Sequence, residues 1–242
     1  MSESATKPEQ PALPTKEELM AYLYNKTYVC PVCQKQFEDT VIRRSKLRKT
    51  YTEIDFRSHY KDIDPNLYEI AICTFCGYGA MANYFDRITP RQQEWIEEKI
   101  TPNYKYKEYD LPLSPADAMD RYKHALACAQ VINAKASIKA IMCLKMSWIY
   151  RDAKDEKAEL TLLKFAYSGL KEAYTTENFP LGTMDENTTR FIIAEMARRL
   201  GDFDEALRMI SDVITSRTVP SLIKERAQDL KELIKEKNSA LV

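Results

Sequence analysis

Apolar residues recur at three- and four-residue intervals through most of the second half of this chain. That spacing lines them up on one face of an α-helix, so it predicts a row of helices joined by short breaks. The predicted helices cover residues 115–131, 135–151, 155–174, 187–200, 203–216 and 220–237. One longer break, "TTENFPLGTMDEN" at 175–187, contains Pro180 and Gly182 and is predicted to be a loop.

The first half follows another pattern, in which β-branched and aromatic residues gather in short runs around two C-x-x-C sequences. Such runs predict short strands. Two capping boxes predict helices on either side: Thr15 with Glu18 opens a short helix that ends near Tyr24, and Thr89 with Gln92 opens another. The first half is therefore predicted to be a small β unit flanked by helices.

Together these patterns predict a mainly α protein with a small β unit. We divide the chain of 242 residues into a polar tail, a β-containing domain with flanking helices and a helical domain, at 1–14, 15–110 and 111–242. The stretch "TPNYKYKEYDLPL", residues 101–113, has little periodicity and is predicted to be a linker packed against one or both domains. With 45% hydrophobic residues, the chain can bury a sizeable core.

Within the helical half, residues 193–220 resemble a tetratricopeptide repeat, which is a helix pair of about 34 residues. The small, turn, aromatic, small and closing-proline positions of that pattern are occupied by Ala194, Gly201, Phe203, Ala206 and Pro220. An earlier segment, 138–170, repeats the helix pair but lacks the turn glycine. We therefore expect a short tetratricopeptide-like solenoid of two to three α-α repeats, with an ordinary helical bundle as the alternative.

Four cysteines carry the clearest chemistry in the sequence. Cys30 and Cys33 form one C-x-x-C pair, and Cys73 and Cys76 form another after 39 intervening residues. Each pair can aim two sulfurs at one point from a tight turn, and two such turns give the tetrahedral sulfur set that zinc prefers. We expect a zinc ribbon with one structural Zn²⁺; iron in a rubredoxin-like site and a redox dithiol are the alternatives. Four protein thiolates leave no position for water or substrate, so the site is expected to be structural.

Two features depart from an ordinary zinc ribbon. Gln34 follows the first pair, whereas Gly77 follows the second pair, where a left-handed backbone conformation is commonly needed. The gap between the pairs also exceeds the usual spacing of about 15–20 residues, so it must contain structure of its own. The other two cysteines, Cys128 and Cys143, lie alone on predicted apolar helix faces and are expected to be buried core thiols.

The stretch from Tyr28 to Ala80 resembles a bacterial family known as domain of unknown function 2225. The resemblance rests on both cysteine pairs, on S-x-L-R and D-F-x-x-x-Y elements, and on the run "NLYEIAICTFCGY". The family also has tetratricopeptide-like repeats downstream, so the resemblance extends over most of residues 24–220. It implies the same architecture and metal site, and it implies no reaction.

The charges of the chain balance. Lys and Arg together number 36, as do Asp and Glu; residues 15–110 hold 15 of each sign, and residues 111–242 hold 20 basic and 19 acidic residues. Neither domain therefore has the basic excess of a dominant nucleic-acid or anionic-membrane surface. The tail lacks a signal-peptide pattern and no run of about 18 apolar residues occurs, so we expect a cytoplasmic location and no membrane partner.

One local exception is "RRSKLRK", residues 43–49, with five basic residues in seven. As a functional feature it would be a phosphate-contacting strip beside the zinc ribbon, with Tyr51, Phe56 and Tyr60 available to stack on bases. As a structural feature, its cations would offset the charge of about −2 on a zinc ion with four thiolates. The candidate nucleic-acid contacts are Arg43, Arg44, Lys46, Arg48 and Lys49.

No catalytic motif appears. His59 lies among Asp55, Asp62 and Asp64, but the spacing fits no hydrolase or metalloenzyme motif, so we expect a surface or capping histidine. The sequence contains no Gly-rich phosphate loop, no nucleophile elbow and no H-E-x-x-H. We therefore expect that the protein is not an enzyme.

On the later repeat, Glu195, Arg198 and Arg199 are expected on or near the groove face, where charged side chains grip peptide carboxylates or phosphates. The alternative is a solvated helix surface on which Glu195 and Arg199 form a simple i,i+4 pair. The leading hypothesis is a cytosolic, non-enzymatic adaptor whose helical repeats bind a protein or peptide. The alternative is a nucleic-acid-binding protein that uses the basic strip at 43–49.

Overall fold

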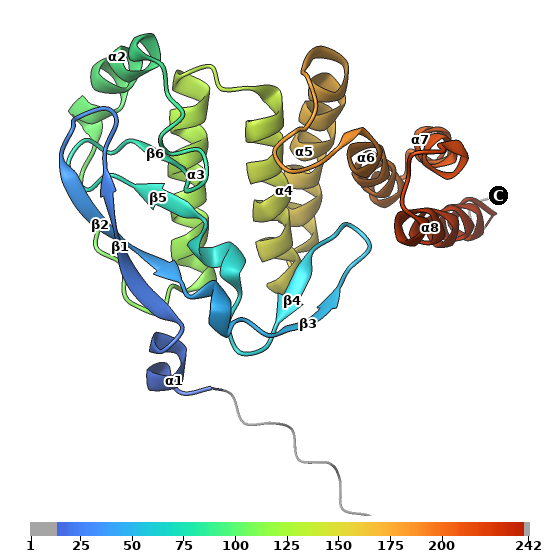
Figure 1. Ribbon diagram of the computed structural model, residues 1–242, viewed down its shortest axis with the longest axis horizontal. Helices are drawn as coiled ribbons and strands as arrows, with labels where there is room; N and C mark the ends of the chain where they lie inside the picture. The colour runs from blue at the N-terminus through green and yellow to red at the C-terminus, as the bar shows by residue number, and fades with distance from the viewer. Residues whose placement is uncertain (1–13, 240–242) are drawn as a thin grey trace, which may run out of the picture.

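The computed structural model describes residues 14–239, so nearly all of the tail predicted at 1–14 lies outside the described residues. A small β unit forms the first half and helices form the second, which confirms a mainly α protein with a small β unit (Figure 1). The first half contains, in order, α1 (Lys16–Met20), β1 (Leu23–Val29), β2 (Gln36–Ile42), β3 (Lys49–Thr52), β4 (Ser58–Tyr60), β5 (Ile70–Ile72), β6 (Gly79–Met81) and α2 (Pro90–Lys99). Short 3-10 turns cover Arg44–Lys46, Pro65–Tyr68 and Thr101–Asn103.

The six strands pair as three antiparallel hairpins, β1–β2, β3–β4 and β5–β6. The first and third hairpins each carry one cysteine pair in their turn, because Cys30 directly follows β1 and Cys73 directly follows β5. A two-stranded hairpin is marginally stable alone in water. Each hairpin must therefore obtain its stability from what it packs against or binds.

Helix α1 is shorter than the sequence predicts. The predicted helix extends to about Tyr24, whereas α1 ends at Met20. The reason is the β1–β2 hairpin, in which Leu23 pairs with Ile42 and so begins a strand. Both predicted capping boxes, at the starts of α1 and α2, are formed.

The second half contains, within the described residues, α3 (Pro115–Val131), α4 (Ala136–Asp152), α5 (Glu156–Thr176), α6 (Glu186–Leu200), α7 (Phe203–Thr215) and α8 (Ser221–Ser239). Each begins and ends within about two residues of its predicted position, the ordinary uncertainty of helix ends. Each helix packs against the next along the chain, and α6 also packs against α8. The helices thus form an open array, with α3 at one end and α8 at the other (Figure 1).

The turns between these helices use left-handed residues. Gly201 ends α6 with a φ of 82°, as the tetratricopeptide pattern predicts. The turn between α4 and α5 lacks a glycine, and Lys154 takes the left-handed conformation there with a φ of 58°. Ala194 and Ala206 are fully buried, so small side chains stand where α6 and α7 approach each other.

Helix α3 joins the two halves. Tyr122 and Ala125 of α3 share one hydrophobic cluster with Ile70 of β5, Met81 of β6 and Met142 of α4. The segment at 101–113, predicted as a linker, leads into α3 along the β unit. Helix α3 therefore packs against elements of both predicted domains. The boundary between residues 110 and 111 stays a prediction.

The β3–β4 hairpin reaches across to helices that lie far along the sequence (Figure 1). The ring of Phe56, in its turn, lies 5.0 Å from the ring of Phe191 on α6, measured between centroids. The guanidinium of Arg226 on α8 lies over the same Phe56 ring at 5.5 Å. Together with contacts to α4, described below, these show that α4, α6 and α8 present one common surface, here called the inner face.

Candidate metal centre and the charged surfaces around it

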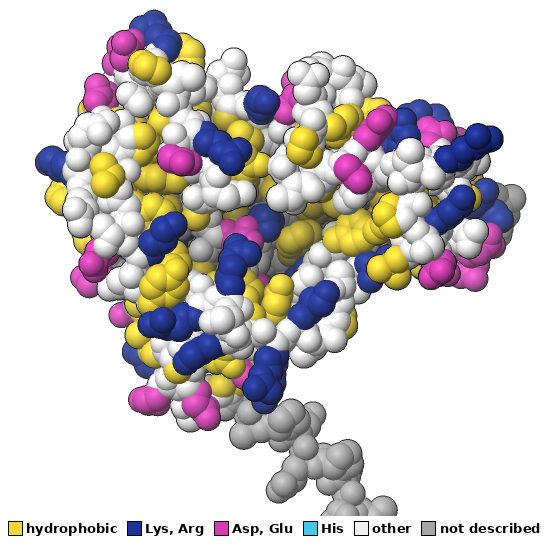
Figure 2. Space-filling model, viewed as in Figure 1, with side chains coloured by type: hydrophobic (Ala, Val, Ile, Leu, Met, Phe, Trp, Pro, Cys, Tyr) yellow, Lys and Arg dark blue, Asp and Glu magenta, His cyan; other side chains and the backbone are white. Residues whose placement is uncertain are grey.

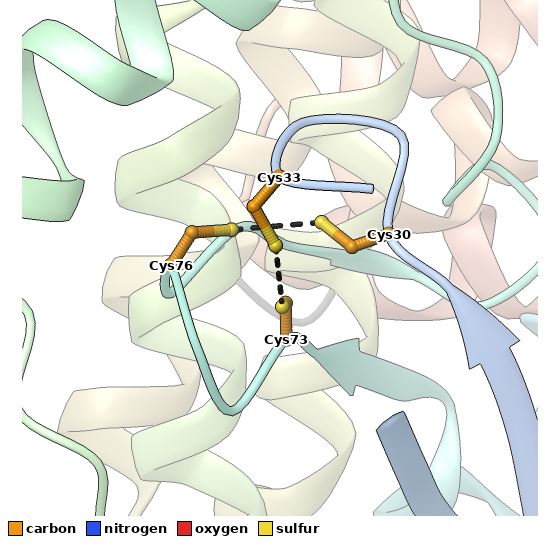
Figure 3. Close-up of side chains that lie close together, drawn as sticks. All are labelled: Cys30, Cys33, Cys73 and Cys76. Carbon is orange, nitrogen blue, oxygen red and sulfur yellow. Dashed lines mark hydrogen bonds between the residues drawn. The ribbon is translucent and has the colours of Figure 1, made fainter. Parts of the chain in front are cut away.

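The four predicted cysteines converge on one point (Figure 3). Their sulfurs all lie within 4.8 Å of one another, with 3.5 Å between Cys30 and Cys76 and 3.6 Å between Cys33 and Cys73. A disulfide needs about 2.05 Å between sulfurs, whereas a tetrahedral metal with bonds of about 2.3 Å places them about 3.8 Å apart. The arrangement could hold a metal ion on four thiolates. Among the residues that the structure describes, it is the one such group found.

The two C-x-x-C turns share one backbone pattern. In each, the N–H of the residue after the second cysteine donates to the carbonyl of the first, from Gln34 to Cys30 at 2.9 Å and from Gly77 to Cys73 at 3.0 Å. Backbone hydrogen bonds therefore close both turns. The two halves of the site are built alike, although 39 residues separate them in sequence.

The shared pattern explains Gln34, the position at which a glycine was expected. Gln34 has a φ of 60° and Gly77 a φ of 77°, so both take the left-handed conformation. Gln34 is exposed, and its side-chain Nε2 donates to the Pro31 carbonyl at 2.7 Å. At Gly77 a Cβ would lie 2.3 Å from Cγ of Tyr104, so no side chain fits. The first turn requires only a positive φ at position 34. The second requires a positive φ at position 77 and also the absence of a side chain there.

Protonation of the cysteines is linked across the cluster. The interaction with Cys73 raises the pKa of Cys30 to about 12. The pKa of Cys76 is also raised, by Cys30 first and then by Cys73. Hydrogen bonding with Cys30 and then with Cys76 lowers the pKa of Cys73 to about 2. A divalent cation at the centre would favour ionisation of all four.

Helices α2 and α3 close over the second cysteine turn. Nε2 of His124 lies 2.6 Å from the Gly77 carbonyl, and the Cys128 thiol donates to the same carbonyl at 3.6 Å. Burial raises the pKa of Cys128 to about 11, so it stays a thiol, as expected of a core cysteine. Thr101, just after α2, donates to the Cys76 carbonyl at 3.0 Å. His124 was not predicted from the sequence, where its only signal is that it precedes Cys128 by four residues on one helix face.

His59 is not part of the four-cysteine cluster. It forms no ion pair with Asp55, Asp62 or Asp64, the acidic residues near it in sequence. It pairs with Glu53 and stacks on Tyr51, with 4.1 Å between ring centroids. Its side chain is 20% exposed, so it is partly buried where a surface histidine was expected. The nearby Asp55 is engaged elsewhere, by helix α4.

Buried charges fix the β3–β4 hairpin to α4. The Asp55 carboxylate, in a residue 2% exposed, accepts hydrogen bonds from Trp148 Nε1 and from Arg151, each at 2.8 Å. Arg57, 3% exposed, donates to the Trp148 carbonyl at 3.0 Å and pairs with Asp152. Burial alone would lower the pKa of Arg151, but Asp55 beside it raises that pKa above its ordinary value. Each buried charge has an opposite partner, without which its burial would be very costly.

Arg151 extends this network to the next helices. Its Nε donates to Glu159 of α5 at 2.8 Å, and Glu159 also pairs with Arg199 of α6. A continuous chain of ion pairs therefore runs from the hairpin through α4 and α5 to α6. Sequence patterns give no sign of it, because its members are 40 or more positions apart at two of the steps.

The three predicted partner-binding residues lie at the end of that chain. Glu195 is 2% exposed and accepts two hydrogen bonds from Arg198, at 2.7 and 2.8 Å. Since Arg199 pairs with Glu159, the alternative i,i+4 pair of Glu195 with Arg199 is not the one formed. Arg198 and Arg199 line a surface hollow of about 660 Å³, together with Lys154 and other residues of α5 and α7. Glu195 is a buried support for Arg198 and does not face solvent.

The predicted basic strip is exposed at all five of its basic positions. Two of the five serve the local structure: Nε of Arg43 donates to the Leu23 carbonyl at 3.2 Å, and Nζ of Lys46 donates to the Ala21 carbonyl at 2.9 Å. At the second cysteine turn a cation comes from another segment, since the ammonium of Lys35 lies over the ring of Phe75 at 4.9 Å.

Comparison with family models finds one match: the family described as "Uncharacterized protein conserved in bacteria" (DUF2225) matches residues 23–234. Comparison with curated proteins and with solved structures finds no match. None of the described helices combines the length and apolar character needed to cross a membrane.

Proposed function

Because the chain belongs to the family of uncharacterized bacterial proteins DUF2225, which brings no activity with it, we propose a function from its own residues. The protein is a cytosolic, non-enzymatic adaptor in which a zinc-held β unit and helical repeats bind a protein or peptide. A cytosolic location keeps the thiols reduced and available to the metal. The proposal has two parts, the metal and the partner, which are tested separately.

Zinc is the metal that the four sulfurs suit best. Four thiolates at tetrahedral spacing match its preferred structural site, although iron takes the same ligands. With four protein ligands the ion has no open position, so its contribution is to hold two cysteine turns together. Structural zinc contributes folding free energy outright, which a β unit of two-stranded hairpins needs.

Elemental analysis of the purified full chain tests the metal. We expect about one zinc per chain, and none after Cys73→Ser with Cys76→Ser. Cys143→Ser is the matched control, because that cysteine is equally buried but lies in the helical array. Stoichiometric iron, or the absence of metal from the unaltered chain, would contradict the assignment.

The adaptor role is supported chiefly by the packing of the β3–β4 turn on the inner face. Helices α4, α6 and α8 grip a non-helical segment of the same chain through Asp55, Phe56 and Arg57. Arginine–carboxylate pairs and an aromatic contact are the means by which helical repeats bind extended peptides. The ion-pair chain continues from this segment to the hollow at Arg198 and Arg199, which is open to a partner's carboxylate.

Site-specific photo-cross-linking in cells tests the partner. A photo-reactive residue at the exposed Glu156, which lines the hollow, should give one discrete adduct that is lost on Arg198→Ala with Lys154→Ala. The same residue at Thr175, exposed at the far end of α5, is the control and should give none. Identical adducts from both positions, or none from either, would remove the support for a binding site here.

A further inference from the structure

One surface hollow differs from the others in charge. It has a volume of about 720 Å³ and lies between the β1–β2 hairpin, the turn after β6, helix α4 and the loop before α6. Its charged lining residues are Lys26, Arg43, Arg44 and Lys145 against Glu69 alone. In four other hollows on the described surface, basic and acidic lining residues differ in number by at most one. We call this site the basic hollow; Figure 2 shows Lys and Arg side chains gathered around the depression in this face.

The positive charge of the basic hollow is not neutralised from within. Glu69 is paired with Lys145 at 2.8 Å, which leaves three cations. Lys26, Arg43 and Arg44 are all exposed, and within the described part of the chain none has a carboxylate within 4.0 Å. In a protein with a formal net charge of zero, such a concentration in a concave site attracts an anion.

Aromatic rings accompany these cations. The guanidinium of Arg43 lies over the ring of Tyr24 at 5.0 Å, and Tyr24 is 38% exposed. The ammonium of Lys26 lies over the ring of Tyr28 at 4.5 Å. A stacked arginine and tyrosine offer a flat surface to a planar ligand group beside charges that suit phosphate.

The hollow on the other side of the basic strip has no such excess. It is lined by Lys46, Arg48 and Lys61 against Glu18, Asp62 and Asp64, so its charges cancel. The predicted strip therefore divides into two parts. Arg43 and Arg44 open onto the basic hollow, whereas Lys46 and Arg48 open onto a neutral one.

We propose that the basic hollow binds single-stranded nucleic acid, with Lys26, Arg43 and Arg44 on its phosphates and Tyr24 against a base. A single strand is slim and flexible enough to bring phosphates into a depression of this size, and its bases stack on any exposed aromatic ring. A lipid surface is flat, whereas these cations line a depression. An acidic peptide would use the cations but has no base for Tyr24. The site is independent of the inner face and of the adaptor role.

Fluorescence anisotropy with the zinc-loaded full chain tests the proposal, using labelled U12 and dT12 oligonucleotides in a salt series. We expect dissociation constants of about 1–100 µM near 0.15 M salt, and a logarithmic salt slope of about −2 for three phosphate contacts. Lys26→Gln with Arg44→Gln should weaken binding about tenfold or more and reduce the slope by about 1.4. Arg43 is left in place because it also donates to the Leu23 carbonyl.

The matched control is Arg48→Gln with Lys61→Gln, which removes two exposed cations from the neutral hollow and should leave binding within about twofold. Arg44→Glu alone is a second variant, and thermal melts establish that each variant is folded. No binding of either oligonucleotide at 50 mM salt overturns the proposal. So do equal losses in both double variants, or tighter binding to phosphatidylserine vesicles or to a glutamate-rich peptide than to the oligonucleotides.

Discussion

Gln34 and Gly77 occupy equivalent positions in two turns of the same backbone geometry, yet they meet different constraints. A left-handed conformation costs a residue with a side chain about 1–2 kcal/mol. Gln34 offsets part of that cost through its hydrogen bond to the Pro31 carbonyl. Gly77 has no such freedom, because Tyr104 occupies the space where a side chain would begin.

We predict that Gln34→Gly changes the free energy of unfolding by less than about 1 kcal/mol, since relief of the backbone strain and loss of the hydrogen bond nearly cancel. Gly77→Ala should cost more than about 3 kcal/mol, because backbone strain and overpacking against Tyr104 act together. Urea denaturation of the zinc-loaded protein measures both. Equal effects of the two changes would show that Tyr104 does not restrict position 77 more than the first turn restricts position 34.

Sequence alone identified the four clustered cysteines but could not separate these two cases. The C-x-x-C spacing is local, so Cys30 and Cys33 are read directly from it. The space beside Gly77 is set by Tyr104, which lies 27 positions away on another segment. A sequence pattern can indicate that a turn needs a positive φ. It does not indicate which distant residue packs against that turn.

The position of the β3–β4 hairpin depends on its contacts with α4. Asp55 is almost fully buried and faces both Trp148 and Arg151. Removing a carboxylate from such a site leaves the arginine buried with less compensation, which costs more than the pair itself contributes.

We predict that Asp55→Ala lowers the free energy of unfolding by about 3–5 kcal/mol, as expected when a buried ion pair loses one partner. Lys61→Ala, a change to an exposed side chain just after β4, should stay within about 0.5 kcal/mol. Chemical denaturation followed by tryptophan fluorescence measures both, since Trp148 lies at the contact. A loss below about 1 kcal/mol for Asp55→Ala would mean that the hairpin is only loosely attached.

Elements differ in how far sequence predicts them. The helices from α3 to α8 were predicted within about two residues because capping residues and apolar spacing are local signals. The end of α1 was wrong, since pairing of Leu23 with Ile42 overrides local helix preference. Docking of the β3–β4 hairpin onto the inner face had no local signal, because it depends on charges from distant helices.

Helix α3 connects the candidate metal centre to the helical array. Its residues His124 and Cys128 touch the second cysteine turn, while Tyr122 packs with β5, β6 and α4. Loss of the metal should therefore loosen α3 as well as the β unit. The later helices have their own core around Phe191 and Ile210 and should not depend on it.

Hydrogen exchange with and without a zinc chelator measures how far the effect of metal loss extends along the chain. We predict that backbone amides of β5, β6 and α3 lose protection on metal removal, whereas those of α6 and α7 keep most of theirs. Loss of protection along the entire chain would show that the array cannot stand without the metal. Loss confined to the two cysteine turns would show that α3 does not transmit it.

The reach of the β3–β4 hairpin also sets an order of events during synthesis. All four clustered cysteines have been made once Cys76 emerges. Phe56 must wait for Phe191 and then for Arg226, which is 170 positions after it. At about 5–20 residues per second, that wait lasts roughly 10–30 s. During this interval the complete inner face has not formed, so Phe56 and the charged residues beside it in the hairpin are not yet fully buried. A growing chain whose β unit is already closed by its metal would keep the hairpin in place until the last helices arrive.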